Sequence, residues 1–362
     1  MKIAYVIPTF LPNVGGAEVI AYETAKRLAE RGHEVDVYTS KTYFSKDLGK
    51  RLEVMDGVNV FRYPNVFECG YFIRYWGRDF LRQLASGDYD LVAPYSFGHI
   101  NSILALRYAH KAGIKHVMHS IIDLPPRSFF ARHAKNFYNW VSFKVTLRYN
   151  ERFTTFTDFE KEWLVARGAD VGDVALLPPG IPDMAYDKYS KEEDFVLYVG
   201  RIHKTKGLQY LVRVMKGLDT RLVIAGPDSG FKAELEGIIS REGISNVEFV
   251  GPVFGKDKYD LISRCKVFVL PTSFEAFGIV LLEAMAQSKA IVTTHAGAVP
   301  YWVGDEAKVV EYGDVAGLRG AIEILLKDDK LREKMGRLGR KKAAGYKWDA
   351  IIDKTLEVYG SL

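Results

Sequence analysis

Short apolar runs alternate with helix-like stretches along most of the 362-residue chain, and this alternation constrains the fold more than any other feature. Strands that alternate with helices form parallel sheets covered by helices on both faces. The sequence therefore predicts an α/β fold. Runs rich in β-branched and aromatic residues place the strands at 2–7, 33–39, 58–63, 90–95, 115–120, 152–157, 174–178, 195–200, 221–226, 247–251, 266–271, 290–294 and 307–311. Helical patterns occupy 17–31, 314–327, 330–344 and 348–360.

A segment rich in proline and charge, residues 178–194, interrupts the alternation near the middle of the chain. We expect it to connect two doubly wound, Rossmann-like domains, residues 1–180 and 181–345. In sheets of this kind, ligands bind beyond the carboxyl ends of the strands. The expected ligand site is therefore a cleft between the two domains.

Composition narrows the function classes. The net charge of +5 is small for this length and the basic residues are spread along the chain, which argues against a nucleic-acid-binding protein. Two cysteines, Cys69 and Cys265, favour a reducing compartment over a disulfide framework. No apolar run has the length of a signal peptide or a membrane span, so we expect a cytoplasmic protein.

The strongest chemical signal is the segment 275–283, which follows the strand 266–271 and opens a helix. The free amides of Phe277, Gly278 and Ile279 at the helix start can bind an anion. Glu275 and Glu283 flank that position, and the helical rise from Gly278 to Glu283 is about 7.5 Å. Two acceptors beside an anion site fit a sugar–diphosphate–ribose ligand. The alternative is that both glutamates are ordinary solvated charges at a helix start.

Two further loops follow predicted strands. Arg201 and Lys206 lie after the strand 195–200, where two cations can neutralise a departing nucleoside diphosphate. Gly15 and Gly16 lie between the strand 2–7 and the helix 17–31, where backbone can approach a phosphate closely. The alternatives are a solvated polar loop for the first pair and a plain turn for the second.

His119 ends the apolar strand 115–120, again at a carboxyl end. A catalytic role beside the ligand is one interpretation. The other is a buried histidine whose hydrogen bonds are satisfied within the fold.

Taken in order, these motifs resemble the retaining GT-B glycosyltransferases of glycosyltransferase family 4, also described as glycosyl transferases group 1. The matching segments cover nearly the whole chain: Gly15–Glu18, the strand start at Tyr89–Asp90, His119, the turn 178–181, the loop 200–207, 225–227, 249–251 and the Glu-x7-Glu element at 275–283.

The resemblance implies roles for single residues. Gly16, Arg201 and Lys206 would hold the diphosphate, and Glu283 the ribose. Glu275, with the amides of Phe277 and Gly278, would contact the donor sugar and its phosphates. His119 would lie beside the reacting sugar and the backbone near Val253 beside the base. The last helix, within 346–362, would cross back to the first domain.

The chain departs from the family pattern at two places. Many members have Pro-Asn-Gly where this chain has Pro179-Gly180, and Gly-Gly-x-x-Glu where it has 297–301. The first departure concerns the hinge turn and the second the rim of the cleft. Neither changes the proposed cationic groups.

Several other enzyme classes are disfavoured. The sequence Asp88-Tyr-Asp90 imitates a metal-binding motif of another glycosyltransferase fold, but it precedes a strand and fits a solvated turn better. We therefore predict no obligatory metal or other cofactor. The chain has no Gly-x-Gly and no P-loop motif, which argues against dehydrogenases and P-loop enzymes.

The predicted function is retaining transfer of a hexose-type sugar from a UDP- or GDP-sugar to a lipid-linked, polysaccharide or small-molecule acceptor. A nucleotide-sugar epimerase of the same fold and a non-catalytic sugar-nucleotide-binding protein are the alternatives. Residues 127–152 interleave basic and aromatic side chains, which is typical of peripheral membrane contact. An aromatic core with a solvated basic rim explains the same pattern equally well.

Overall fold

A computed structural model describes residues 1–13, 15–43, 46–69, 73–120, 129–150, 152–187 and 189–362, with the side chains of 43, 69, 73 and 129–137 outside the description. The chain divides into two compact units, the first formed by Met1–Pro178 with Ile351–Leu362 and the second by Pro179–Ala350. The domain limits expected from the sequence, 180/181 and 345/346, lie near these unit limits.

The first unit is built on a six-stranded sheet with the order β10-β9-β1-β2-β6-β5. All neighbouring strands are parallel except β5 and β6, which form an antiparallel pair. The strands are β1 (Lys2–Val6), β2 (Glu34–Ser40), β5 (Leu52–Met55), β6 (Val58–Tyr63), β9 (Leu91–Pro94) and β10 (Lys115–His116). The helices of this unit are α1 (Gly16–Glu30), α2 (Arg78–Ala85), α3 (Ile100–Ala112), α4 (Phe129–Tyr149) and α5 (Asp158–Val165).

The predicted strand 115–120 is divided between two sheets. Its first part is β10, whereas β11 (Met118–His119) belongs to a three-stranded parallel sheet with β12 (Phe153–Thr155) and β13 (Val174–Leu176). The sequence also missed β5 and two small hairpins. These hairpins are β3 (Thr42–Tyr43) with β4 (Lys46–Asp47), and β7 (Phe67–Cys69) with β8 (Ile73–Tyr75). Short strands exposed on one face lack the apolar runs that reveal buried parallel strands.

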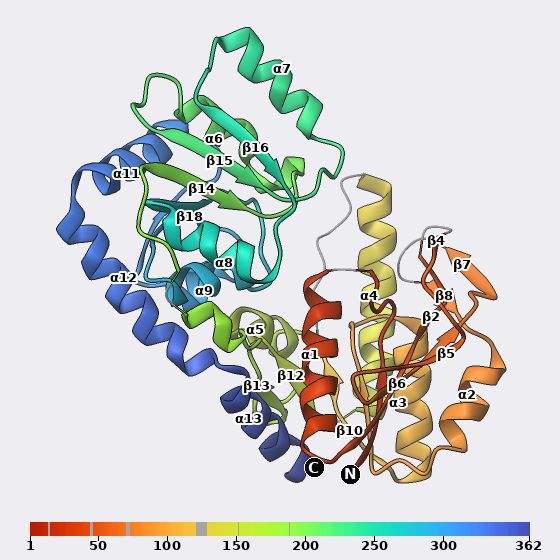
Figure 1. Ribbon diagram of the computed structural model, residues 1–362. Coiled ribbons are helices and arrows are strands. Elements are labelled where there is room, and N and C mark those ends of the chain that lie inside the picture. Colours follow the sequence, from red (N-terminus) through yellow and green to blue (C-terminus); the bar gives the residue numbers. More distant parts are fainter. Residues whose placement is uncertain (14, 44–45, 70–72, 121–128, 151, 188) are drawn as a thin grey trace. The chain divides into compact units, whose positions relative to one another are not determined.

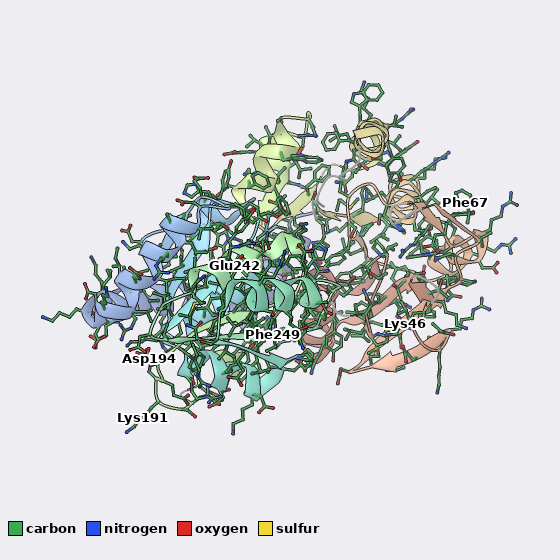
Figure 2. All side chains as sticks on the ribbon, turned by 90° about the horizontal axis from the view of Figure 1, so that it is seen from above. Lys46, Phe67, Lys191, Asp194, Glu242 and Phe249 are labelled. Carbon is green, nitrogen blue, oxygen red and sulfur yellow. The ribbon has the colours of Figure 1, made fainter. Side chains whose placement is uncertain are left out.

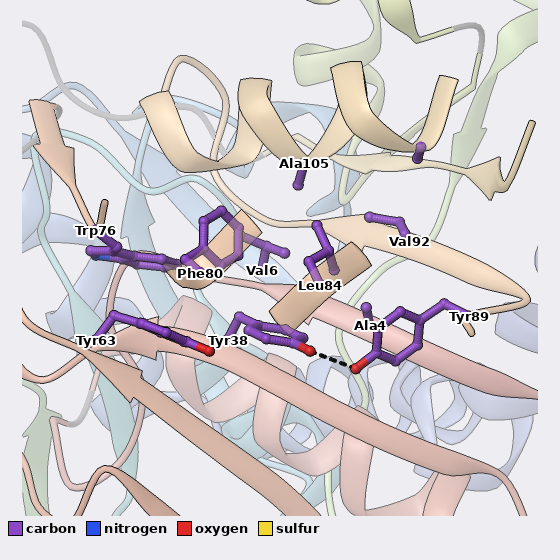
Figure 3. Packing of buried hydrophobic residues seen from close by; sticks show 11 residues of the cluster. Ala4, Val6, Tyr38, Tyr63, Trp76, Phe80, Leu84, Tyr89, Val92 and Ala105 are labelled. Atoms are coloured by element: carbon purple, nitrogen blue, oxygen red, sulfur yellow. Dashed lines mark hydrogen bonds between the residues drawn. The ribbon is translucent and has the colours of Figure 1, made fainter. Parts of the chain in front are cut away.

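An aromatic cluster packs α2 and α3 against one face of the six-stranded sheet (Figure 3). Tyr38 of β2 stacks on Tyr63 of β6, and Phe80 of α2 meets Tyr38 edge-on at 5.7 Å. The hydroxyls of Tyr38 and Tyr89 are hydrogen-bonded at 2.6 Å, so the polar ends of these buried rings are paired. Ala105 of α3 faces the sheet and lets the helix approach closely.

The second unit has a six-stranded, fully parallel sheet with the order β16-β15-β14-β17-β18-β19. Numbered from its first strand, this is the order 3-2-1-4-5-6 of a doubly wound dinucleotide-binding fold. The strands are β14 (Phe195–Val199), β15 (Arg221–Ala225), β16 (Val247–Gly251), β17 (Val267–Leu270), β18 (Ala290–Thr294) and β19 (Ala307–Val310). Each was predicted from the sequence, because central strands such as β14 and β17 are buried at every residue.

Helices cover this sheet in two groups (Figure 1). The helix α6 contacts α7 and α11, whereas α9 contacts α8 and α12. The bounds are α6 (Leu208–Val214), α7 (Lys232–Glu242), α8 (Gly255–Arg264), α9 (Ile279–Ala286), α10 (Val299–Trp302), α11 (Val315–Lys327) and α12 (Asp329–Ala343). At the outer strand β16, the Lys232 ammonium lies 5.2 Å from the ring centroid of Phe249, which Figure 2 labels.

The last helix, α13 (Trp348–Gly360), starts in the second unit and continues in the first from Ile351. Within the first unit, the Tyr359 hydroxyl is hydrogen-bonded to that of Tyr5 in β1 at 2.9 Å. Arg31, which follows α1, forms an ion pair with Asp353. The end of the chain is therefore part of the core of the first unit.

Candidate active site

The candidate donor site lies in the second unit, where the strand order reverses. The first strand, β14, and the fourth, β17, are neighbours in the sheet and run parallel. Their carboxyl ends are therefore side by side, and the loops 200–207 and 271–278 follow them. This switch point is where doubly wound sheets bind their ligands.

The loop after β14 carries the two predicted cations. Arg201 is exposed, and among the residues that the structure describes no carboxylate lies within ion-pair distance of it. Beneath it, the hydroxyl of the buried Tyr198 donates to the Arg201 carbonyl at 2.8 Å. Burial, followed by the negative charge of Glu275, raises the pKa of Tyr198 well above its usual range, so this hydroxyl remains a donor. The Tyr198 hydroxyl thus holds the Arg201 backbone in place, while the Arg201 guanidinium is open to solvent.

The loops after β14 and β17 are joined to each other. The amide of Ser273 donates to the Thr205 carbonyl at 2.8 Å, and the Lys206 ammonium forms an ion pair with the Glu275 carboxylate. Each of these two charged side chains is only 15% exposed. Lys206 and Glu275, predicted as separate donor contacts, are therefore direct partners in this structure.

A glycine makes the close approach of the two loops possible. Gly207 has φ +69°, and a Cβ atom there would lie 1.8 Å from the Pro271 carbonyl oxygen. A second close approach involves Gly297, whose Cβ would lie 2.3 Å from the Glu275 carbonyl oxygen. The Glu275 loop therefore packs against Gly297, at the start of the segment 297–301 where the chain departs from the family pattern, and the spacing of the motifs did not indicate this contact.

Helix α9 begins at the expected place. Gly278 caps it with φ +87°, and Ile279 is its first residue. The Phe277 ring is buried and stacks on Trp302 at 4.6 Å between centroids, while Trp302 Nε1 donates to the Phe277 carbonyl at 2.9 Å. Phe277 therefore fixes the helix start through its ring and carbonyl, which leaves the amides at the start of α9 as the groups that can contact a ligand.

Glu283, the predicted ribose contact, has partners that the sequence did not indicate. Its side chain is 8% exposed, and its Oε1 accepts from Lys258 Nζ at 2.6 Å and from the Tyr259 hydroxyl at 3.0 Å. Both donors come from α8, which contacts α9. Lys258 is remote from the 275–283 motif in sequence, so spacing could not reveal it.

Val253 lies half-buried in the short loop between β16 and α8. The next residue, Phe254, is 68% exposed. The sequence singled out only Val253 in this loop.

The two glycines predicted to approach a phosphate, Gly15 and Gly16, lie at the start of α1. Gly15 is its N-cap in an extended conformation, and Gly16 is its first residue. A Cβ on Gly16 would meet no heavy atom within 4 Å, so the fold itself does not require glycine there. The neighbouring Glu18 is buried and accepts hydrogen bonds from the Thr9 hydroxyl and, at 3.1 Å, from Asn13 Nδ2.

His119 has partners for both ring nitrogens within the first unit. Nδ1 is 2.6 Å from the Thr154 hydroxyl and Nε2 is 2.8 Å from the Tyr359 hydroxyl, while the ring stacks on Tyr95 at 4.3 Å. Burial lowers the pKa of His119 to about 3. This geometry is that of a neutral, satisfied histidine, the second of the two interpretations of the sequence. The catalytic assignment stays a prediction, and it requires His119 to exchange one of these partners.

The basic aromatic segment 127–152 lies partly outside the described residues. Of the described side chains in α4, Phe143 is buried in the core, whereas Trp140 is 55% exposed. Lys144 Nζ lies 4.2 Å from the Trp140 ring centroid. This part of the helix therefore contributes both to the core and to the surface.

Within the described ranges, no group of three or more His, Cys, Asp and Glu side chains is arranged to hold a metal ion. None of the helices described there combines the length and apolar character needed to cross a bilayer.

Comparison with known proteins assigns both halves of the chain. The family described as Glycosyltransferase Family 4 matches residues 14–183, and that described as Glycosyl transferases group 1 matches residues 186–342. The chain belongs to glycosyltransferase family 4. This retaining glycosyltransferase uses a nucleotide-sugar donor. The epimerase and the non-catalytic binding protein are set aside accordingly.

Among curated relatives, the enzyme is 26% identical to a D-inositol 3-phosphate glycosyltransferase of Kineococcus radiotolerans, over 96% of this chain and 90% of the relative. It is 24% identical to an N-acetyl-alpha-D-glucosaminyl L-malate synthase of Bacillus anthracis, over 92% of this chain and 90% of the relative. Over 47% of each chain, it is 34% identical to the capsular polysaccharide biosynthesis glycosyltransferase CapM of Staphylococcus aureus.

Solved structures share the GT-B fold of the glycosyltransferase. HepE of Anabaena in complex with UDP has a TM-score of 0.81 at 18% identity, covering all of both chains. Sucrose-phosphate synthase of Thermosynechococcus elongatus has a TM-score of 0.78 at 18% identity, covering 100% of this chain and 99% of that one. The predicted fold class is confirmed.

Proposed function

We propose that this glycosyltransferase binds a UDP- or GDP-hexose at the switch point of its second sheet and transfers the hexose to a lipid-linked, polysaccharide or small-molecule acceptor. The observation that supports the proposal is the joining of the β14 and β17 loops, which links the segment leading into α9 to the loop that carries both Arg201 and Lys206. Cations and helix amides that converge in this way suit a diphosphate.

The two cations have different tasks in this proposal. Arg201 has an open guanidinium that binds phosphate oxygens in a bidentate way. Lys206 turns from Glu275 towards the diphosphate as the donor enters, and Glu275 then accepts from hydroxyls of the donor sugar. Glu283 accepts from the ribose, and the backbone beside Val253 contacts the base. Gly16 lets the start of α1 approach the phosphates.

The reaction that we propose proceeds on one face of the sugar. The bond from the anomeric carbon to the phosphate oxygen breaks while the bond to the acceptor oxygen forms on the same side, which retains the configuration. The acceptor proton passes to the oxygen of the leaving phosphate. Arg201 and Lys206 stabilise the charge that develops on the departing diphosphate.

A screen of nucleotide sugars tests the donor assignment. The protein is heated with UDP-, GDP- or ADP-sugars, and we expect one base class to raise the melting temperature. UDP is the first candidate, because the similar HepE structures contain UDP or UDP-glucose. No stabilisation by any of these donors would remove the donor assignment.

A liposome test addresses the acceptor. If the acceptor is lipid-linked, we expect the cytoplasmic enzyme to bind anionic vesicles through 127–152, with binding that weakens in high salt. Trp140→Ala should reduce this binding, because Trp140 is the exposed aromatic residue on the described part of α4. If the enzyme does not bind the vesicles at either low or high salt, a water-soluble acceptor is favoured.

Metal independence is tested separately, by measuring turnover in the presence of an excess of chelator.

A further inference from the structure

Two residues of α8 hold the carboxylate that we assign to the ribose. Lys258 Nζ and the Tyr259 hydroxyl, at 2.6 and 3.0 Å, both donate to Oε1 of Glu283. The Lys258 side chain is 22% exposed, and its ammonium lies 4.7 Å from the Tyr259 ring centroid. Tyr259 is itself buried and stacks on Tyr189 at 6.5 Å.

The geometry divides the two oxygens of Glu283 between different uses. An ionised carboxylate has about four acceptor positions. Lys258 and Tyr259 occupy the Oε1 side, and within the described part of the chain no residue donates to Oε2. A carboxylate that is almost fully buried is costly to keep without a charged partner. Lys258 supplies that charge and at the same time fixes which oxygen remains available.

We propose that Lys258 is a positioning residue for ribose recognition: it anchors Glu283 through Oε1 so that Oε2 can accept from a ribose hydroxyl of the donor. This inference rests on the proposed function, because it assigns a partner to the ribose contact of the same site. Tyr259 has the auxiliary role, since its neutral hydroxyl makes the longer bond to the same oxygen.

A simpler role for Lys258 has a different signature. If the positive charge of Lys258 only attracted the diphosphate, its loss would weaken the binding of nucleotides with and without the ribose 2′-hydroxyl equally. If it only supported the fold, its loss would lower stability without changing the preference between the two. Anchoring of Glu283 instead predicts a loss confined to nucleotides that carry the hydroxyl.

The experiment measures dissociation constants of UDP and 2′-deoxy-UDP by calorimetry, or of GDP and 2′-deoxy-GDP if the donor screen selects guanine. The wild type should prefer the ribonucleotide by about 10- to 100-fold, the value of a hydrogen bond to a charged group. Lys258→Met keeps the length of the side chain and removes its charge. It should weaken ribonucleotide binding by about 10-fold or more and leave the deoxynucleotide nearly unchanged. Lys258→Arg should restore most of the preference, and Tyr259→Phe should lower it less.

The outcomes separate this inference from the proposed function. A wild type that binds neither nucleotide contradicts the proposed function itself. A wild type that prefers the ribonucleotide, with a Lys258→Met variant that keeps the preference, overturns only the role of Lys258. Tighter ribonucleotide binding by Lys258→Met also overturns it, because Lys258 would then compete with the ribose for Glu283.

Discussion

The two six-stranded sheets share a strand order around their first strand, but they present different chemistry at the switch point. In the second sheet, charged side chains gather there: Arg201 is open, and Lys206 faces Glu275 across two joined loops. In the first sheet, the strand that follows β9 leads to His119, which is neutral, buried and bonded to Thr154 and Tyr359.

The topology of a doubly wound sheet provides a place for a ligand, and the side chains at that place decide which ligand it suits. Charges at the second switch point suit a diphosphate, which needs cations. At the first switch point, the buried Glu18 and the neutral, buried His119 take the place of the two cations. Substitutions at the two places should therefore have separable effects on turnover and on stability.

The largest expected effect tests the charged switch point. Arg201→Ala and Lys206→Ala should each lower kcat by about 10²-fold or more, as the loss of one transition-state donor does. Lys204→Ala is the matched control, since Lys204 lies in the same short turn but is paired with the exposed Glu234. Near-normal turnover in both variants, measured with the selected donor, would show that the charges serve another purpose.

The joined loops of the second sheet should also be sensitive to a single methyl group. In Gly207→Ala the new Cβ collides with the Pro271 carbonyl, so we expect a loss of about 2–4 kcal/mol in the free energy of unfolding. Gly217 has a similar φ of +76°, but nothing lies within 4 Å of its Cβ position. Gly217→Ala should therefore cost only about 1 kcal/mol in urea unfolding. Equal losses of unfolding free energy in the two variants would mean that the positive φ at residue 207, and not the contact between the loops, is why a glycine is needed there.

Acid should destabilise the first unit through its buried histidines. Burial lowers the pKa of His119 to about 3, and burial together with the charge of Arg74 lowers that of His99 to about 3. Between about pH 6.5 and 3 the unfolded chain binds these protons and the folded one does not, so stability falls as the pH falls. Each histidine contributes up to about 1.4 kcal/mol per pH unit.

Two variants isolate this contribution. His119→Asn should make the dependence of the unfolding free energy on pH less steep, and His110→Asn, at an exposed histidine of α3, is the control substitution. Tyr359→Phe removes the bond to Nε2, so lower stability with normal turnover would assign His119 to the fold. A turnover loss in His119→Asn without a comparable loss of stability would support the catalytic prediction.

The smallest effect on stability is expected at Gly16, where the fold leaves space for a side chain. Gly16→Ala should change the free energy of unfolding by no more than about 1 kcal/mol, in the stabilising direction, since alanine is the better helix former. If the start of α1 approaches the phosphates, the same variant should raise KM for the donor. An unchanged KM would limit diphosphate binding to the second sheet.

Much of the fold could be predicted from the sequence. Buried parallel strands such as β14 and β17 are continuous apolar runs, and the glycines and charges that end them lie next to them in the chain. Because the loop 200–207 and the start of α9 follow such strands directly in the chain, the sequence also predicted their positions in the fold. The division of 115–120 between two sheets was missed, because an apolar run does not tell which sheet it joins.

The sequence by itself determined the α/β fold class, the family and the loops that follow β14 and β17, since these depend on local pattern. Only the tertiary structure decided which side chains are partners. It paired Lys206 with Glu275, brought Lys258 to Glu283 from another helix, and bonded His119 to Tyr359 at the far end of the chain. Such contacts depend on how helices pack on a sheet, and residues far apart in sequence carry no local signal of the distance at which they meet.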